Sequence, residues 1–294
     1  MESIHLVIGA DGQIGSALFR RLQSAGESVI GTTRRHANVN ERCLHLDLAN
    51  RMDEWKPPRP VNVATICAGV TTVQACKSNA VSATAVNVEG ISNLVTNLVA
   101  GGAFVILLST NQVFDGSIAS QGPDAPLTPM TEYGRQKAEA ERRMAQHGDS
   151  IAIVRFAKVF GAQPSLISGW ADSLRHGKSI RAFSDMSLAP IPLSCAVTVL
   201  TLVAGLRLSG VLQVSAKEDI SYADAARIGT KALGADPGLV QPVTAADSGS
   251  YADHVPAHTT MNIDRLKATL GIVPPDVRWT VEMAFTHPQL LAGS

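Results

Sequence analysis

The sequence of 294 residues predicts an α/β fold built on a doubly wound parallel sheet, with a smaller C-terminal α/β lobe. Three observations carry this prediction. Short runs of β-branched and other apolar residues alternate with stretches of helical length, and the runs are apolar throughout, as strands covered on both faces are. A third observation is a glycine-rich stretch directly after the first run, where a strand leads into a helix.

Six apolar runs in the first half of the chain are the predicted strands, and most are followed by stretches of helical length such as SALFRRLQSAG and ATAVNVEGISNLVTNLVAG. The strands are expected at 4–9, 28–33, 43–48, 61–67, 103–109 and 151–156. Later in the chain the alternation loosens, and we expect one further strand at 210–216 with helices at 221–234 and 262–271. This change predicts a first domain of residues 1–160 and a smaller lobe of residues 161–294, interleaved with the first.

Charge and hydropathy narrow the class of protein. The 25 basic residues balance the 25 acidic ones, and no run of Lys and Arg is long enough to follow a phosphate backbone, so nucleic acid is not an expected partner. The N-terminus lacks the basic, apolar and small-residue segments of a signal peptide, and the longest apolar stretch, roughly 197–208, is too short to span a bilayer. We expect a cytoplasmic protein with no membrane partner.

The cysteines and histidines predict no metal site. The cysteines lack CxxC spacing, which is typical of reduced, mostly buried thiols; they are Cys43, Cys67, Cys76 and Cys195. His254 and His258 are four residues apart, but Pro256 between them disfavours the helix that would place both on one face. We therefore expect a plain loop there.

The stretch VIGADGQIG indicates a phosphate cradle. Gly9 would permit a tight turn, Gly12 would let the backbone approach a pyrophosphate, and Gly15 would let the helix pack closely on the sheet. The N-terminus of that helix would supply amide donors and a partial positive charge. A simple strand-to-helix turn is the alternative, since glycines near a turn are common.

The end of the second predicted strand indicates which dinucleotide the cradle takes. An acid about twenty residues beyond the glycines holds the 2′-hydroxyl of NAD, whereas an arginine there suits a 2′-phosphate. The chain has Arg34 and Arg35 at this place and no acid, which favours NADP(H) over NAD(H). The alternative is a solvated basic loop.

Three side chains predict the chemistry. Tyr133 and Lys137 are four residues apart, so on a helix they share a face, and the cation would lower the pKa of the phenol. Tyr133 would then donate a proton to a carbonyl oxygen as hydride reaches the carbon. Thr110 follows the fifth strand, at the carboxyl edge of the sheet, where its hydroxyl would hold the same oxygen. A Tyr-x-x-x-Lys pair alone is weak evidence for this chemistry, because helices carry such pairs by chance. Its combination with the glycines and the strand-end hydroxyl is strong evidence.

With these motifs the chain resembles the extended short-chain dehydrogenases/reductases, which have a Rossmann fold. The matching segments are GADGQIG, LDL at 46–48, CAG at 67–69, VNVEG at 86–90, STNQVFDG at 109–116, YGRQK at 133–137 and VRFAKVFG at 154–161. Within these enzymes the chain is most similar to the dTDP-4-dehydrorhamnose reductase group, part of the NAD-dependent epimerase/dehydratase enzymes. The resemblance extends to the C-terminal MNIDRLKATLGI, which looks like the family's closing helix.

The resemblance implies roles for individual residues. Thr110, Tyr133 and Lys137 would form the catalytic triad, with Lys137 also holding the nicotinamide ribose. Phe156, which with Arg155 begins the segment leading into the sugar-nucleotide lobe, is placed with the cofactor-binding residues. The others implied by the resemblance are Asp11, Gln13 and Ile14 at the pyrophosphate turn, Asp47 and Leu48 beside the adenine, Ala68, Gly69 and Val70 beneath the ribose, and the structural Asn87.

The chain also departs from the family pattern. Asn111 and Gln112 stand where the rhamnose-type reductases commonly have Asp-Tyr, and an asparagine paired with an aromatic residue is not evident in GAQPSLISGW. The 4,6-dehydratases have Asp-Glu after the threonine, and since amides cannot transfer protons, dehydration is disfavoured.

The sequence therefore predicts an NAD(P)H-dependent reductase of a nucleotide-linked keto-sugar or similar carbonyl compound, with the hydride from nicotinamide and the proton from Tyr133. A sugar-nucleotide epimerase and a non-catalytic dinucleotide-binding regulatory subunit remain alternatives. The expected partner is a small-molecule substrate, a nucleotide sugar. Formation of a homodimer is left as a further possibility.

Overall fold

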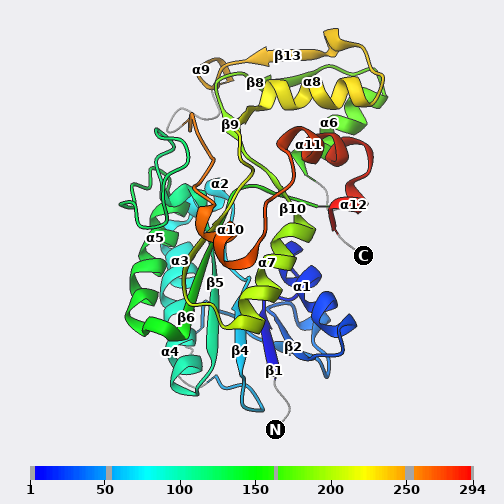
Figure 1. Ribbon diagram of the computed structural model, residues 1–294. Coiled ribbons are helices and arrows are strands. Elements are labelled where there is room, and N and C mark those ends of the chain that lie inside the picture. Colours follow the sequence, from blue (N-terminus) through cyan, green and yellow to red (C-terminus); the bar gives the residue numbers. More distant parts are fainter. Residues whose placement is uncertain (1–3, 51–54, 162–164, 249–254, 293–294) are drawn as a thin grey trace. The chain divides into compact units, whose positions relative to one another are not determined.

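The computed structural model describes residues 4–50, 55–161, 165–248 and 255–292 (Figure 1). The chain divides into two compact units. The first comprises Met1–Phe114, Pro126–Arg155 and Val197–Leu212, and the second comprises Asp115–Ala125, Phe156–Ala196 and Gln213–Ser294.

The first unit is built on a seven-stranded parallel sheet with the strand order β11-β6-β5-β4-β1-β2-β3. The strands are β1 (Ile4–Ile8), β2 (Ser28–Thr33), β3 (Cys43–His45), β4 (Val63–Ile66), β5 (Phe104–Thr110), β6 (Ile151–Phe156) and β11 (Gly210–Val214). The order reverses at β1, which pairs in parallel with β2 on one side and β4 on the other. This arrangement confirms the predicted doubly wound fold, in which ligands bind at the carboxyl edge beside the reversal.

Helices cover both faces of this sheet (Figure 1). On one face, apolar residues of α4 and α5 pack on those of β1, β4, β5 and β6 in a continuous core, and Figure 1 shows α1 and α7 on the other face. The helical elements are α1 (Gln13–Ser24), η1 (His36–Asn38), α2 (Val73–Ser78), α3 (Ala80–Thr84), η2 (Ala85–Gly90), α4 (Ile91–Ala100), η3 (Asn111–Val113), α5 (Glu132–Met144), η4 (Ala145–Ser150) and α7 (Leu193–Leu206). Strands buried on both faces explain why the strand runs are apolar throughout.

The second unit has its own apolar core, formed by α6, α8 and α11 with short strands. The strands pair two by two: β7 (Val159–Phe160) with β10 (Ile191–Pro192), β9 (Ser187–Leu188) with β12 (Ile220–Ser221), and β8 (Ile180–Phe183) with β13 (Val240–Val243). The helical elements are α6 (Leu166–Arg175), α8 (Tyr222–Ala232), η5 (Pro237–Leu239), α9 (Ala245–Ser248), α10 (Asp264–Leu270), α11 (Val277–Thr286) and α12 (Pro288–Ala292). The lobe is thus α/β, as predicted.

The structure divides the chain differently from the boundary predicted at residues 160 and 161. Residues 115–125 fall in the second unit, whereas residues 197–212, which include most of α7 and the start of β11, fall in the first. The reason is that β11 extends the first sheet next to β6, a contact between segments far apart in the sequence. Among the described residues, no helix combines the length and hydropathy that a membrane span needs.

Candidate active site

The glycine loop of the first unit has room for backbone only. Gly9 has a φ of 81°, a left-handed conformation that favours glycine, and a Cβ there would come within 2.9 Å of Ala68. A Cβ on Gly15 would overlap the Gly9 carbonyl oxygen, so α1 packs directly on the loop. α1 begins after Gly12 without a side-chain cap, so its first-turn N–H groups point out of the helix end, where an anion is accepted. The loop therefore fits a dinucleotide pyrophosphate.

Two threonines at the end of β2 hold this loop in place. The Thr32 hydroxyl accepts the Gly9 N–H at 3.1 Å, and the Thr32 carbonyl accepts the Ala10 N–H at 2.8 Å. The Thr33 hydroxyl donates to the Asp11 carboxylate at 2.9 Å. Sequence reasoning missed both threonines, although hydroxyls at a strand end beside a glycine loop were a visible signal.

The predicted phosphate clamp lies just beyond these threonines. Arg34 and Arg35 are exposed, and the Arg35 guanidinium lies 3.7 Å from the Asp11 carboxylate. Because 66% of the Arg35 side chain is exposed, this ion pair is weak and leaves the guanidinium able to turn to another anion. Next to the arginines, the rings of His36 and His45 stack with centroids 4.1 Å apart.

Two further pairs of predicted cofactor residues lie at the ends of elements. Gln13 and Ile14 open α1, and both are half-buried. Asp47 and Leu48 follow β3, and the Asp47 carboxylate accepts the N–H of Ala49 at 3.0 Å. Leu48 lines a cavity of about 350 Å³; the other lining residues are Ala49, Asn50, Ala85, Glu89, Gly90 and Asn93.

Asn87 holds the loop that contains Ala68, Gly69 and Val70. It lies in the π-helical turn η2 and is buried, and its amide accepts the Val70 N–H at 2.8 Å and donates to the Val70 carbonyl at 2.9 Å. Its amide nitrogen also donates to the Gln136 side chain at 2.8 Å. The structural role implied for Asn87 would therefore be to hold the Ala68–Val70 loop through the backbone of Val70. Sequence reasoning missed Gln136, because an amide inside a helix carries no local signal of its partner.

The three predicted catalytic residues come together in the first unit. Thr110 ends β5 and is 6% exposed, and its hydroxyl is hydrogen-bonded to the Tyr133 side chain. Tyr133 and Lys137 are one turn apart on α5, where Lys137 is 6% exposed. The helix starts at this place because the Thr131 hydroxyl caps it, accepting the Gly134 N–H at 3.0 Å.

The protonation of the pair differs from the expectation. The sequence predicted that Lys137 lowers the pKa of Tyr133, but burial raises this pKa, the Cys76 thiol raises it further, and the Thr110 hydrogen bond opposes both. Burial also lowers the pKa of Lys137 to about 8, against the effect of the Glu141 carboxylate. Desolvation of the phenolate is therefore the largest influence on the Tyr133 pKa, and Tyr133 keeps its proton at neutral pH.

The side-chain amides of Asn111 and Gln112, which follow Thr110, make contacts within the protein. The Gln112 side chain accepts the Thr131 hydroxyl at 3.0 Å, and a Cβ on Gly134 would overlap the Gln112 carbonyl oxygen. Gln112 thus packs against the start of α5. Asn111 lies next to Thr110, with 3.4 Å between its side-chain oxygen and the Thr110 hydroxyl.

A buried ion pair lies one turn beyond Lys137. The side chains of Glu141 and Arg155 are almost fully buried, and the guanidinium donates to both carboxylate oxygens, at 2.7 Å in the shortest contact. The Ser109 hydroxyl, next to Thr110, also donates to Glu141. The Arg155 guanidinium lies 5.1 Å from the centre of the Phe114 ring. Sequence reasoning gave Glu141 no role.

Comparison with known families identifies the group. Residues 3–289 match the family described as the RmlD substrate binding domain. The chain belongs to this family. Because the match spans almost the whole chain, both units are part of the family's architecture.

Relatives of this RmlD-family chain are named as reductases. It is 26% identical over 280 residues to a probable low-salt glycan biosynthesis reductase, Agl14, of Haloferax volcanii, covering 92% of this chain and 93% of that one. It is 27% identical to a dTDP-4-dehydrorhamnose reductase of Burkholderia thailandensis, covering 94% and 96%. A solved dTDP-4-dehydrorhamnose reductase from Bacillus anthracis, in complex with NADP, superposes with a TM-score of 0.84 at 18% identity, covering 97% and 99%. The structural likeness shows that the fold is shared.

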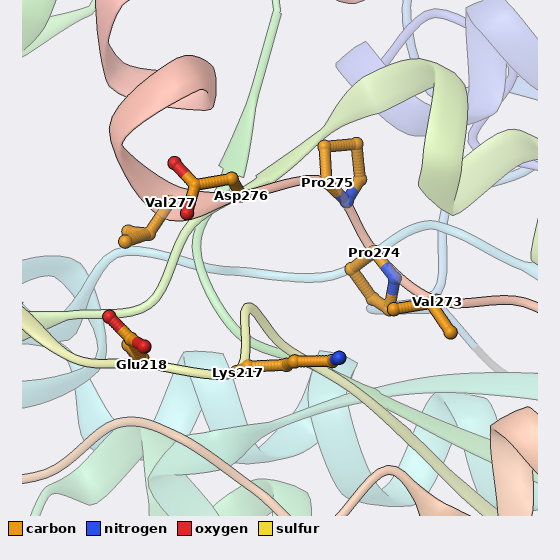
Figure 2. Close-up of a pocket in the computed structure, with 7 residues that line it drawn as sticks. All are labelled: Lys217, Glu218, Val273, Pro274, Pro275, Asp276 and Val277. Carbon is orange, nitrogen blue, oxygen red and sulfur yellow. The ribbon is translucent and has the colours of Figure 1, made fainter.

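In this RmlD-family chain the remaining predicted residue, Phe156, is buried and belongs to the second unit. The second unit also contains a cavity of about 280 Å³, shown in Figure 2. Its lining residues are Lys217, Glu218, Val273, Pro274, Pro275, Asp276 and Val277. Of residues 161–170, in which the sequence shows no asparagine paired with an aromatic residue, residues 162–164 lie outside the described residues.

The histidine pair weighed as a metal ligand set is only half described. His254 lies outside the described residues, and His258 pairs with the Asp219 carboxylate at 3.0 Å. Asp219 also accepts hydrogen bonds from the backbone and hydroxyl groups of Thr259 and Thr260. Within the part of the chain that the structure describes, no three His, Cys, Asp or Glu side chains gather as a metal site.

Proposed function

We propose that this protein is an NAD(P)H-dependent reductase of a nucleotide-linked keto-sugar. The observation that carries the proposal is the hydrogen-bonded pair of Thr110 and Tyr133. Lys137 lies one turn beyond Tyr133 on α5, and all three residues belong to the unit that contains the glycine loop. The names of two relatives support the substrate class, since one is a probable reductase of glycan biosynthesis and the other a dTDP-4-dehydrorhamnose reductase.

The residues of the loop hold the cofactor, which supplies the hydride when bound. The glycine cradle and the N-terminus of α1 bind the pyrophosphate, and the Ala68–Val70 segment, fixed by Asn87, forms the surface beneath the ribose. At the adenosine end, Arg34 and Arg35 bind a 2′-phosphate, so NADP(H) is favoured over NAD(H). The Asp11 carboxylate beside Arg35 reduces this preference and does not abolish it.

Tyr133 donates the proton. Its raised pKa keeps the phenol protonated, which is the form a general acid needs, and the Thr110 hydroxyl beside it binds the same substrate oxygen. Lys137 is buried next to this pair, and its charge stabilises the phenolate left after proton transfer. Because a tyrosine, a threonine and two amides supply no second acid and base, reduction is favoured over dehydration.

The test is single-turnover reduction of a panel of nucleotide-linked 4-keto-sugars, followed by loss of NADPH absorbance. We expect at least one member to be reduced with a stoichiometric loss of NADPH. A protein that binds NADPH and reduces no member would indicate the regulatory subunit instead. A protein that interconverts two sugar epimers without net oxidation of the cofactor would indicate an epimerase.

A further inference from the structure

The catalytic lysine has a buried carboxylate on its own helix face that the proposed mechanism does not use. Glu141 follows Lys137 by four residues on α5, so the two side chains share a face, and both are almost fully buried, at 3% and 6% exposure. In such surroundings one charge acts strongly on another, because little water screens them.

The charges of this cluster do not cancel. Glu141 is bound by the Arg155 guanidinium through both carboxylate oxygens, and that pair is neutral as a whole. Lys137 therefore remains as one positive charge in excess. Glu141 is the charge that acts on it, raising the Lys137 pKa against the lowering effect of burial.

Other titratable groups that face α5 are few among the described residues. The elements packed against α5 include α2, η2, α4, β5, η3 and η4. The first five carry Cys76, which acts on Tyr133, the exposed Lys77, and Glu89, which pairs with Arg143. η4 carries His147 and Asp149, which follow Lys137 by ten and twelve residues, beyond the end of α5. Glu141 is thus the acidic group best placed to influence Lys137.

Glu141 also joins three elements. It lies on α5, it accepts the hydroxyl of Ser109 at the end of β5, and it binds Arg155 near the end of β6. Ser109 immediately precedes Thr110, so the carboxylate fixes the strand end that presents the Thr110 hydroxyl.

We propose that Glu141 is a positioning residue of the active site, which keeps the Lys137 amine charged at neutral pH and ties the catalytic helix to the ends of β5 and β6. This inference rests on the proposed reductase function for its effect on rate. Its effect on Lys137 itself does not depend on any substrate.

The direct test is a lysine titration by NMR of the protein labelled with ¹³C at lysine Cε, with the Lys137 resonance assigned from Lys137→Met. We expect Lys137 to titrate at a lower pH in Glu141→Gln than in the parent, by about one pH unit. Glu141→Asp should restore part of the shift, since it keeps the charge. Ser109→Ala is the matched control, because it removes the hydroxyl contact and leaves the charge, and its Lys137 titration should match that of the parent.

Glu141→Gln leaves Arg155 buried without its carboxylate, so it is expected to melt at a lower temperature. The double variant Glu141→Gln/Arg155→Met removes both charges and should recover stability, and Lys137 should titrate between the single variant and the parent, because the repulsion by the guanidinium is lost together with the attraction by the carboxylate. Recovery of the parent titration together with stability would overturn the proposal, since the role of Glu141 would then be structural only. The same holds if the single variant leaves the Lys137 titration unchanged.

The rate gives a second measurement. In an active parent, the fall of kcat/KM at alkaline pH should move to lower pH in Glu141→Gln, and kcat at pH 7.5 should fall by about threefold, because a shift of one pH unit from a pKa of about 8 lowers the charged fraction of Lys137 by about that factor. If the parent reduces nothing in the sugar panel but its Lys137 titration shifts as expected, the proposed function fails and the inference about Glu141 stands.

Discussion

The two ends of the site in the first unit are built from different groups. At the glycine loop, the groups that make the contacts are backbone atoms, neutral hydroxyls and exposed arginines, and the contacts join the loop to the end of β2, 22 to 24 residues further along the chain. At the catalytic helix, the groups are buried charges and amides, and the contacts join Asn87 and Ser109 to residues of α5 that are 49 and 32 positions away. We expect changes at the loop to alter cofactor affinity and changes at the helix to alter the rate.

The largest effect is expected at the catalytic end. Tyr133→Phe keeps the ring but removes the proton donor, so turnover should fall by about 10² to 10⁴ while NADPH affinity barely changes. NADPH fluorescence and single-turnover reduction measure the two quantities. Lys137→Met is the comparison, because the ammonium is proposed to hold the ribose as well, and it should lose both. Reduction at the parent rate by Tyr133→Phe would exclude the mechanism.

Replacing Arg34 and Arg35 tests the glycine-loop end of the site, where these side chains are exposed. Replacing both Arg34 and Arg35 with alanine should remove about 1.5 to 3 kcal/mol of NADPH binding, the size of a charge-assisted hydrogen-bond contribution. NADH binding should hardly change, because it has no 2′-phosphate. Dissociation constants for the two cofactors in parent and variant give the answer, and equal constants in the parent would refute the NADP preference.

The glycine loop offers a test that involves no side-chain contact. Gly15→Ala places a Cβ against the Gly9 carbonyl oxygen, and the forced shift should weaken NADPH binding by about 1 to 3 kcal/mol. Gly205→Ala on α7 is the matched control, since its added Cβ would meet open space, with nothing within 4 Å beyond its own stretch of helix backbone. Calorimetric titration of both with NADPH is the measurement. A Gly15→Ala protein that binds as the control does would show that the loop is not the cradle.

A pH profile separates the two ends of the site. Lys137 is charged below its pKa of about 8 and neutral above it, so kcat/KM should fall as pH rises past 8, by up to about tenfold per unit. The guanidinium groups at the loop stay charged throughout this range, so the preference for NADPH over NADH should persist. Rates and cofactor affinities measured from pH 6 to 10 test both statements. A profile that stays flat to pH 10 would contradict the role of Lys137.

The apolar runs lie where the strands are. They report which side chains are buried, however, and not which residues are hydrogen-bonded to a neighbouring strand. The run 43–48 shows the difference: β3 ends at His45, yet Leu46 and Leu48 remain buried in the core. Likewise, the stretch from 83 to 101 looked like one helix and includes the π-helical turn η2, which contains Asn87. A hydrophobic pattern reports which side chains leave water, and hydrogen-bond partners decide where an element ends.

By itself the sequence determined the features that depend on neighbours along the chain. Glycines at fixed spacing, a Tyr-Lys pair four residues apart and apolar strands each need only local geometry, so the sequence predicted the doubly wound fold, which the structure confirms, and also the cradle and the catalytic residues, which stay predictions. Only the tertiary structure decided the Asn87–Gln136 contact, the Glu141–Arg155 pair and the return of residues 197–212 to the first unit. It also reversed the expected pKa shift of Tyr133. The reason is that desolvation and long-range pairing depend on which distant segments exclude water from a side chain, and no local pattern records that.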